Sequence, residues 1–194
     1  KQRPNQQIWF SSPTSGPKRF EFNFETMRWV STRNGEDLIE SVTLFAKGAG
    51  LLGLPIVITE QVPEKLGSTM TEILNEVDDQ RLVRKNSFSA FGSREFVDYL
   101  NEFSIDHLFL VGVETPICIY LTALDALKNE LEVSIITDCI GERRKSDGLH
   151  CLEALRTHGC SLIPLETFFY SMLKDSTHPE FKSVSALIRN RNLP

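Results

Sequence analysis

A cysteine in the stretch GVETPICIYLTALDAL (112–127) occupies a position that could support nucleophilic chemistry. Cys118 follows an apolar, strand-like run and lies near the start of an apolar segment with helical spacing. The N–H groups and the dipole of a helix N-terminus stabilise an anion, which would favour the reactive thiolate over the thiol. The alternative is that Cys118 packs as a small hydrophobic residue, as buried cysteines usually do. Position alone leaves both interpretations open.

A lysine among hydrophobic residues is the second candidate for chemistry. Lys85 ends a short apolar stretch in RLVRKNSFSAFGS (81–93) and is followed by Phe88 and Phe91. Its ammonium is either a solvated loop charge or a group that is half removed from water. Phe88 and Phe91 could form a pocket wall or pack into the core. Lys85 alone does not decide between these roles.

The segments that would position these side chains show two kinds of apolar pattern, one typical of strands and the other typical of helices. A period-2 pattern at Phe20, Phe22 and Phe24 predicts a half-buried strand, and continuous apolar runs predict strands buried on both faces. The predicted buried strands are 54–60, 107–113, 132–138 and 160–165. Helical spacing predicts helices at 37–52, 93–103, 116–129, 146–157, 166–174 and 180–190.

Alternating strands and helices favour right-handed crossovers and a mostly parallel sheet with helices on both sides. The predicted fold is therefore an α/β protein, a three-layer α/β/α sandwich, with a tail at 1–19 and a single domain at 20–194. Ligands of such sheets bind beyond the carboxyl ends of the strands. Glu60 and Gln61 follow one of these ends and are candidates for orienting a substrate.

Composition excludes several classes of protein. The net charge of −5 is too mild for a nucleic-acid surface, and no apolar run approaches the roughly 20 residues of a membrane helix. Four cysteines without a C-x-x-C pair indicate reduced thiols in an intracellular protein. We expect a cytoplasmic location; the basic N-terminal segment leaves mitochondrial import as an alternative.

Several stretches together resemble the isochorismatase-like cysteine hydrolase superfamily, in particular its eukaryotic isochorismatase-domain-containing branch. The similarity extends from about residue 20 to residue 190 and its motifs occur in the same order. It is carried by LPIVITEQVPEKLG (54–67), RKNSFSAF (84–91), LFLVGVETPICIYLTALDAL (108–127), VSIITDCIGER (133–143) and HPEFKSVSALI (178–188).

The resemblance implies a triad of Asp, Lys and Cys at the carboxyl edge of the sheet. Cys118 would be the nucleophile and Lys85 the lysine. A cis peptide bond would join Val113 to Glu114, and the amides of Glu114 and Cys118 would form an oxyanion hole. This chain departs from the pattern at the aspartate, whose place falls on Asn23.

An amide cannot take a proton from a thiol at ordinary pH. Three alternatives follow: Glu21 or Glu25 serves as the base, the thiol relies on Lys85 and the helix dipole, or the site has lost turnover and only binds. The two functional hypotheses are thus a hydrolase of small polar amides, imides or vinyl ethers acting through Cys118, and a weakened homologue that binds or scaffolds as a homo-oligomer.

The remaining predictions concern cofactors and partners. None of the four histidines has a second ligand at metal-binding spacing, and phosphate-binding glycine loops are absent. We therefore predict no metal and no cofactor. The expected partners are a small-molecule substrate and further copies of the chain, with neither nucleic acid nor membrane.

Overall fold

The computed structural model describes residues 19–24, 35–77 and 81–191, and the side chains of residues 19–24 are not part of the description. The predicted tail at 1–19 therefore lies almost wholly outside the described residues. The strands are β1 (Arg19–Phe24), β2 (Ile56–Gln61), β3 (Arg81–Lys85), β4 (His107–Val113), β5 (Glu132–Gly141) and β6 (Ser161–Ile163).

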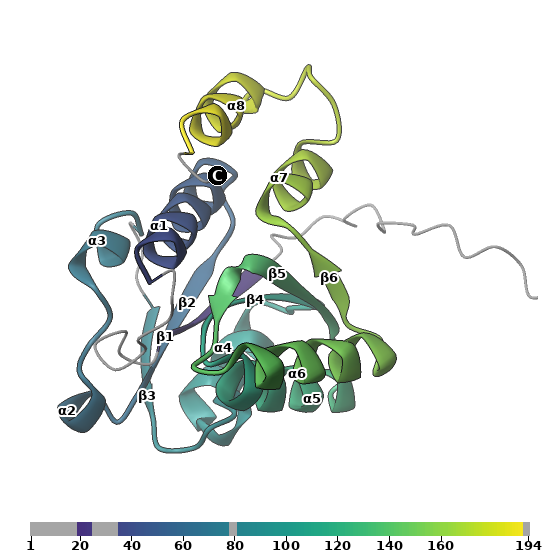
Figure 1. Cartoon of the computed structure of the whole chain (residues 1–194). Coiled ribbons are helices and arrows are strands. Elements are labelled where there is room, and N and C mark those ends of the chain that lie inside the picture. The colour runs from purple at the N-terminus through teal and green to yellow at the C-terminus, as the bar shows by residue number, and fades with distance from the viewer. Residues whose placement is uncertain (1–18, 25–34, 78–80, 192–194) are drawn as a thin grey trace, which may run out of the picture.

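Helices connect these strands and flank both faces of the sheet they form (Figure 1). They are α1 (Gly35–Leu51), α2 (Pro63–Leu66), α3 (Thr71–Leu74), α4 (Arg94–Glu102), α5 (Tyr120–Lys128), α6 (Lys145–Thr157), α7 (Leu165–Leu173) and α8 (Phe181–Arg189). Two short helical turns complete the set: η1 (Ala90–Gly92) and η2 (Thr115–Ile119).

All strand pairs in the sheet are parallel, in the order β3-β2-β1-β4-β5-β6. The order reverses between β1 and β4, because the chain builds outward from β1 in one direction and later continues from β4 in the other. In sheets with such a reversal, ligands usually bind beyond the carboxyl ends of the two strands that flank it, here β1 and β4. The prediction of a mostly parallel α/β/α sandwich is confirmed.

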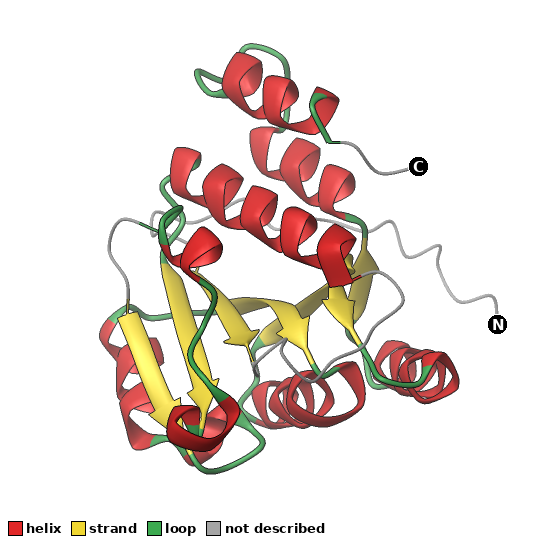
Figure 2. Cartoon of the chain, turned by 60° about the vertical axis from the view of Figure 1, so that its left-hand side comes forward, coloured by secondary structure: helices red, strands yellow, loops and turns green. Residues whose placement is uncertain are grey.

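Two hydrophobic cores lie on opposite faces of the sheet, as Figure 2 shows for the helical layers. Helices α1, α7 and α8 cover one face, and α4, α5 and α6 cover the other. Both β2 and β4 are buried along their whole length. Neighbouring residues of β2 point into different cores: Ile56 and Ile58 into the first, Val57 into the second. Continuous apolar runs therefore marked these strands correctly.

Close packing of α1 against α7 yields a test of the first core. A Cβ on Gly48 would overlap the ring of Phe169, which is fully buried. We expect Gly48→Ala to lower the free energy of unfolding by about 1–3 kcal/mol, since overpacking forces the neighbours to move, and to lower the melting temperature by roughly 3–10 °C.

Gly50, in the same helix, provides the matched control. A Cβ there would meet nothing closer than the Glu76 carbonyl oxygen at 3.8 Å. Because alanine is the better helix former, Gly50→Ala should leave the melting temperature unchanged or raise it slightly. Equal melting temperatures for the two variants, measured by circular dichroism, would contradict the packing described for Gly48.

Candidate active site

Cys118 lies in a turn that interrupts the passage from β4 to α5. Residues Thr115–Ile119 form one π-helical turn, and α5 begins directly after it. The Glu114 carbonyl accepts hydrogen bonds from the N–H groups of Ile117 at 3.1 Å and Ile119 at 3.3 Å. The Cys118 side chain has no exposed area. The predicted strand-to-helix position is confirmed, with a wider turn than an ordinary helix start.

Lys85 stands at the end of β3 and is almost completely buried, with 4% of its surface exposed. Its ammonium donates hydrogen bonds to Gln61 Oε1 at 2.8 Å and to the carbonyl oxygens of Ser87 and Phe88, each at 3.0 Å. These three acceptors match the three N–H donors of an ammonium. The same nitrogen lies 3.8 Å from Cys118 Sγ. The ammonium and the sulfur therefore meet, although 33 residues separate them.

Gln61 fixes the position of Lys85 from the neighbouring strand. The two residues are paired in the register of β2 and β3, and Gln61 Nε2 also donates to the Asn86 carbonyl at 2.7 Å. Glu60 does not join this group. Its Oε1 accepts from the Thr69 N–H at 2.6 Å, and its Oε2 is buried without a hydrogen-bond partner among the described residues. Of the two residues predicted to orient a substrate, the structure brings only Gln61 to Lys85.

The two phenylalanines of the Lys85 loop have different surroundings. Phe88 is 56% exposed, and its carbonyl is one of the Lys85 acceptors. Phe91 packs edge-on against Phe96 of α4, with ring centroids 5.3 Å apart. The loop is also fastened to α5, because the Ala90 N–H donates to Thr122 Oγ1 at 3.0 Å. Phe88 is therefore placed at the surface of the site, while Phe91 contributes to the core.

The peptide bond between Val113 and Glu114 is cis, as the resemblance implied. The Glu114 side chain pairs with the guanidinium of Arg143, whose Nε lies 2.9 Å from Oε1. Sequence analysis missed this contact. Arg143 belongs to a run of charges, ERRK (142–145), that resembles a solvated surface loop. The available signal was a pair of opposite charges in the loops after two strands that turned out to be neighbours, β4 and β5.

Comparison with known proteins identifies the family of this fold and site. The sequence model of the isochorismatase domain matches residues 27–167. Isochorismatase domain-containing protein 2A of Mus musculus is 34% identical over 143 residues, which are 74% of this chain and 68% of the mouse protein. The chain belongs to the isochorismatase family.

Solved structures support the same fold for this isochorismatase-family protein. The MAR1 ribonuclease of Caenorhabditis elegans superposes with a TM-score of 0.85 at 23% identity, covering 92% of both chains. The YcaC gene product of Escherichia coli, an octameric hydrolase of unknown specificity, has a TM-score of 0.84 at 16% identity and covers 94% of this chain and 93% of its own. At these identities the likeness establishes the fold alone.

Asn23 lies outside the isochorismatase match, which begins four residues later. A frataxin-like domain model instead matches residues 1–47, and this range includes β1. In the sheet, Asn23 is paired in register with Thr59 on one side and Gly112 on the other. Its backbone therefore lies near the carboxyl end of β1, between β2 and β4, while the alternative base Glu25 lies outside the described residues.

The other three cysteines are thiols in less favourable surroundings. Burial, with a smaller contribution from the Asp138 carboxylate, raises the pKa of Cys139 well above its ordinary value, although Arg191 opposes the shift. Burial raises the pKa of Cys160 to about 11. Burial and the Asp147 carboxylate raise the pKa of Cys151. These thiols are held in the unreactive, protonated form at neutral pH.

Metal-binding side chains do not cluster in the described part of the chain. Within the described residues, no group of three or more His, Cys, Asp or Glu side chains could hold an ion. His107 is buried, stacks on Phe109 with ring centroids 4.2 Å apart, and lies 2.9 Å from Ser134 Oγ through Nε2. The prediction that no metal takes part stays a prediction.

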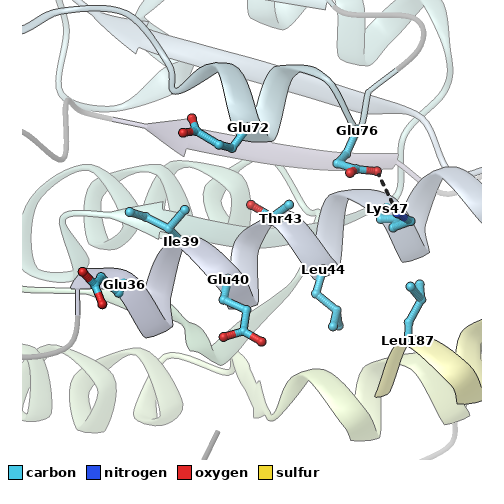
Figure 3. Close-up of a pocket in the computed structure, with 9 residues that line it drawn as sticks. All are labelled: Glu36, Ile39, Glu40, Thr43, Leu44, Lys47, Glu72, Glu76 and Leu187. Carbon is cyan, nitrogen blue, oxygen red and sulfur yellow. Dashed lines mark ion pairs between the residues drawn. The ribbon is translucent and has the colours of Figure 1, made fainter. Parts of the chain in front are cut away.

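A groove of about 460 Å³ lies over α1 and is distinct from the Lys85–Cys118 pair (Figure 3). It runs between α1 and α3 and reaches α8, and none of the predicted site residues lines it. Its lining residues are Glu36, Ile39, Glu40, Thr43, Leu44, Lys47, Glu72, Glu76 and Leu187.

In the described part of the chain, no helix is long and apolar enough to cross a membrane.

Proposed function

We propose that this isochorismatase-family chain is a cysteine hydrolase whose nucleophile is Cys118. The observation that carries the proposal is the buried Lys85 ammonium 3.8 Å from Cys118 Sγ. A cation at this distance favours the thiolate, which is the reactive form of cysteine. Three oxygen acceptors fix the ammonium, so that its charge faces the sulfur without rearrangement.

The reaction proposed for this pair has two steps. The Cys118 thiolate attacks the carbonyl carbon of a small polar amide or imide, a C–S bond forms, and the C=O electron pair moves to oxygen. Collapse of this oxyanion breaks the C–N bond, and the nitrogen leaves as an amine after taking up a proton. Water then hydrolyses the thioester, which releases the acid and restores the thiol. In a vinyl ether, the sulfur would add to the carbon that carries the oxygen while the neighbouring carbon takes up a proton. The C–O bond then breaks as the leaving alcohol oxygen takes up a proton, and water replaces the sulfur to release a carbonyl compound and the thiol.

Oxyanion stabilisation in this scheme comes from the backbone. The N–H groups of Glu114 and Cys118 are the proposed donors, and a pair of aimed donors contributes a few kcal/mol each in well-characterised enzymes. Gln61 and Phe88 are proposed to contact the substrate, whereas the hydrogen bond of Glu60 to the Thr69 N–H and the packing of Phe91 on Phe96 favour structural roles for those two residues. Gln61 and Phe88 have the stronger case, since both are bonded to the Lys85 ammonium.

A second candidate function is a binding or scaffolding homologue that has lost turnover. Asn23 favours it, because the resemblance puts this amide in the place of the family's aspartate, a position that the isochorismatase match does not cover. Detection of a covalent adduct at Cys118 by intact mass, with a panel of small amides, would support the hydrolase. Reversible binding without product, and unchanged by Cys118→Ala, would support the alternative.

Selective alkylation of Cys118 is the direct test of its proposed activation. At pH 7 we expect iodoacetamide to modify Cys118 at least about ten-fold faster than the other three cysteines, because Lys85 favours its thiolate. Peptide mass spectrometry after timed quenching measures each rate. Cys151 is the internal control for access, since it is partly exposed while Cys118 is buried. Faster modification of Cys151 would mean that exposure, and not charge, determines reactivity.

Location and assembly are proposed on less specific grounds. We propose a cytoplasmic protein, consistent with four cysteines that are all thiols. We also propose a homo-oligomer that binds neither nucleic acid nor membrane. The octameric state of the YcaC protein, which shares this fold, supports the first part of that proposal.

A further inference from the structure

The loop that follows β5 contacts the first two residues of the segment that carries Cys118. Arg143 Nε lies 2.9 Å from Glu114 Oε1 and 3.0 Å from Glu114 Oε2. Next to it, Glu142 Oε2 accepts a hydrogen bond from Thr115 Oγ1 at 3.1 Å. The Thr115 hydroxyl also lies 3.0 Å from the Gly141 carbonyl oxygen. Two consecutive loop residues therefore hold two consecutive residues at the entrance of η2.

The pair between Arg143 and Glu114 is asymmetric in burial. The Glu114 side chain is 10% exposed, whereas that of Arg143 is 61% exposed. A buried carboxylate without a partner is costly, so removing the guanidinium would leave Glu114 in an unfavourable place. Glu114 would then turn toward water. Its own peptide unit, which is joined to Val113 and precedes η2, would move with it.

Glu142 is fixed from the opposite side by α6. A Cβ on Gly148 would come within 2.6–2.8 Å of the Glu142 side chain, so glycine at this position leaves the space that Glu142 occupies. Burial raises the pKa of Glu142, while the Thr115 hydrogen bond and Lys145 oppose that shift. The loop after β5 is therefore packed against α6 through Glu142.

The backbone of Glu114 organises the turn in which Cys118 lies. Its carbonyl is bonded to the N–H groups of Ile117 and Ile119, the residues on either side of Cys118. A rotation at Glu114 therefore changes the direction of the N–H groups of both Glu114 and Cys118. Misplacement of reacting groups by about 1 Å can cost on the order of 100-fold in rate.

We infer that Arg143 and Glu142 are positioning residues that hold Glu114 and Thr115 so that the backbone N–H groups at 114 and 118 converge on the substrate oxygen. This inference rests on the proposed function, because convergence matters only if a reaction builds negative charge on that oxygen. In this role neither residue supplies a proton. Their effect is on the geometry of the donors.

Two reactions of the same thiol separate this role from a general loss of structure. Acylation of Cys118 by p-nitrophenyl acetate builds an oxyanion, whereas alkylation by iodoacetamide is a displacement at carbon and builds none. In Arg143→Ala we expect acylation to slow by about 10–100-fold, with alkylation within about three-fold of the parent rate. Arg143→Lys should recover part of the loss, since an ammonium can pair with Glu114 but lacks the planar fork.

Arg144 supplies the matched control. It is the next residue, and it pairs across 3.8 Å with Asp147 and not with Glu114. Arg144→Ala should change neither reaction. Equal acylation rates for Arg143→Ala and Arg144→Ala would overturn the inference, and so would a parallel fall of acylation and alkylation in Arg143→Ala.

Failure of the proposed function has a different signature. If the parent protein is alkylated but not acylated at Cys118, the proposed hydrolase is refuted. Amide hydrogen exchange of residues 114–119 then decides on Arg143 independently of any reaction. Exchange at least ten-fold faster in Arg143→Ala than in Arg144→Ala would support the holding role, and equal exchange would overturn it.

Discussion

Replacing Lys85 with methionine is expected to slow alkylation of Cys118 at pH 7 by about 100-fold or more. Two unit charges about 4 Å apart interact by roughly 4 kcal/mol at the effective dielectric constant of partly buried sites, and each 1.4 kcal/mol corresponds to ten-fold. Because the ammonium is also bonded to three oxygens, its interaction with the sulfur is weaker than this figure. The expected change in rate is therefore smaller than the full value of roughly 4 kcal/mol would give. Iodoacetamide labelling followed by peptide mass spectrometry measures the rate.

The same substitution should destabilise the protein. Gln61 Oε1 and the carbonyl oxygens of Ser87 and Phe88 would lose their common donor, and a buried unsatisfied acceptor costs about 1–3 kcal/mol. Only the Gln61 acceptor is fully buried, whereas the two carbonyl oxygens are part-buried and keep some access to water. We therefore expect a total loss of about 2–4 kcal/mol, and labelling is to be compared at a temperature where circular dichroism shows both proteins folded.

Two controls make the Lys85 result interpretable. Lys47→Met removes an exposed ammonium that pairs with Glu76 at 3.5 Å. Lys47 lines the groove over α1 and not the Lys85–Cys118 site, so this variant should not change labelling of Cys118. Cys118→Ala identifies the labelled peptide. A folded Lys85→Met protein in which Cys118 reacts at the parent rate would show that the ammonium does not activate the thiol.

The strands of the sheet could be predicted to different degrees, for a physical reason. Central strands are buried on both faces, so β4 has the bounds that its apolar run indicates, residues 107–113. β3 lies at the edge of the sheet and has Arg81 and Arg84 exposed. In its sequence, RLVRK, only Leu82 and Val83 are apolar. This stretch is too short and too charged to predict a strand. The short helices α2 and α3 were missed because four residues carry too little periodicity.

The meeting of Lys85 and Cys118 could not be derived from spacing. Lys85 ends β3 and Cys118 follows β4, and both strands end at the same edge, but β2 and β1 lie between them in the sheet. With strands about 4.8 Å apart, the two ends are separated by roughly 14 Å. The side chain of Lys85 and the turn at Cys118 must both reach inward across the intervening strands. Only the family resemblance predicted that they do.

The Arg143–Glu114 pair illustrates a second limit of sequence reasoning. A run such as ERRK is most often a solvated surface, and nothing in its composition distinguishes Arg143 from Arg144. The distinction arises from the order of strands, which places the loop after β5 beside the end of β4. Tertiary neighbours, and not local pattern, give one of two adjacent arginines a buried partner.

Introducing a carboxylate at residue 23 is expected to increase the reactivity of the site. The register pairs Asn23 with Gly112, two residues before Glu114, at the carboxyl end of β1, where the strand order reverses. A general base contributes typically 10²–10⁴-fold when it is well placed. We expect Asn23→Asp to raise the rate of Cys118 acylation by p-nitrophenyl acetate by about 10–100-fold between pH 6 and 7, because the aspartate can accept the thiol proton there.

The alternatives for the base give this experiment its controls. Asn23→Ala adds no carboxylate and should produce no gain. Glu21→Gln tests the nearest acidic residue in β1: a large loss of acylation in that variant would assign the base to Glu21. If Asn23→Asp is folded and gains nothing from pH 5 to pH 8, residue 23 does not occupy the place of the family's aspartate. If Glu21→Gln also leaves acylation unchanged, Lys85 and the helix dipole become the better explanation of any thiol reactivity, and the binding function becomes the better interpretation of the site.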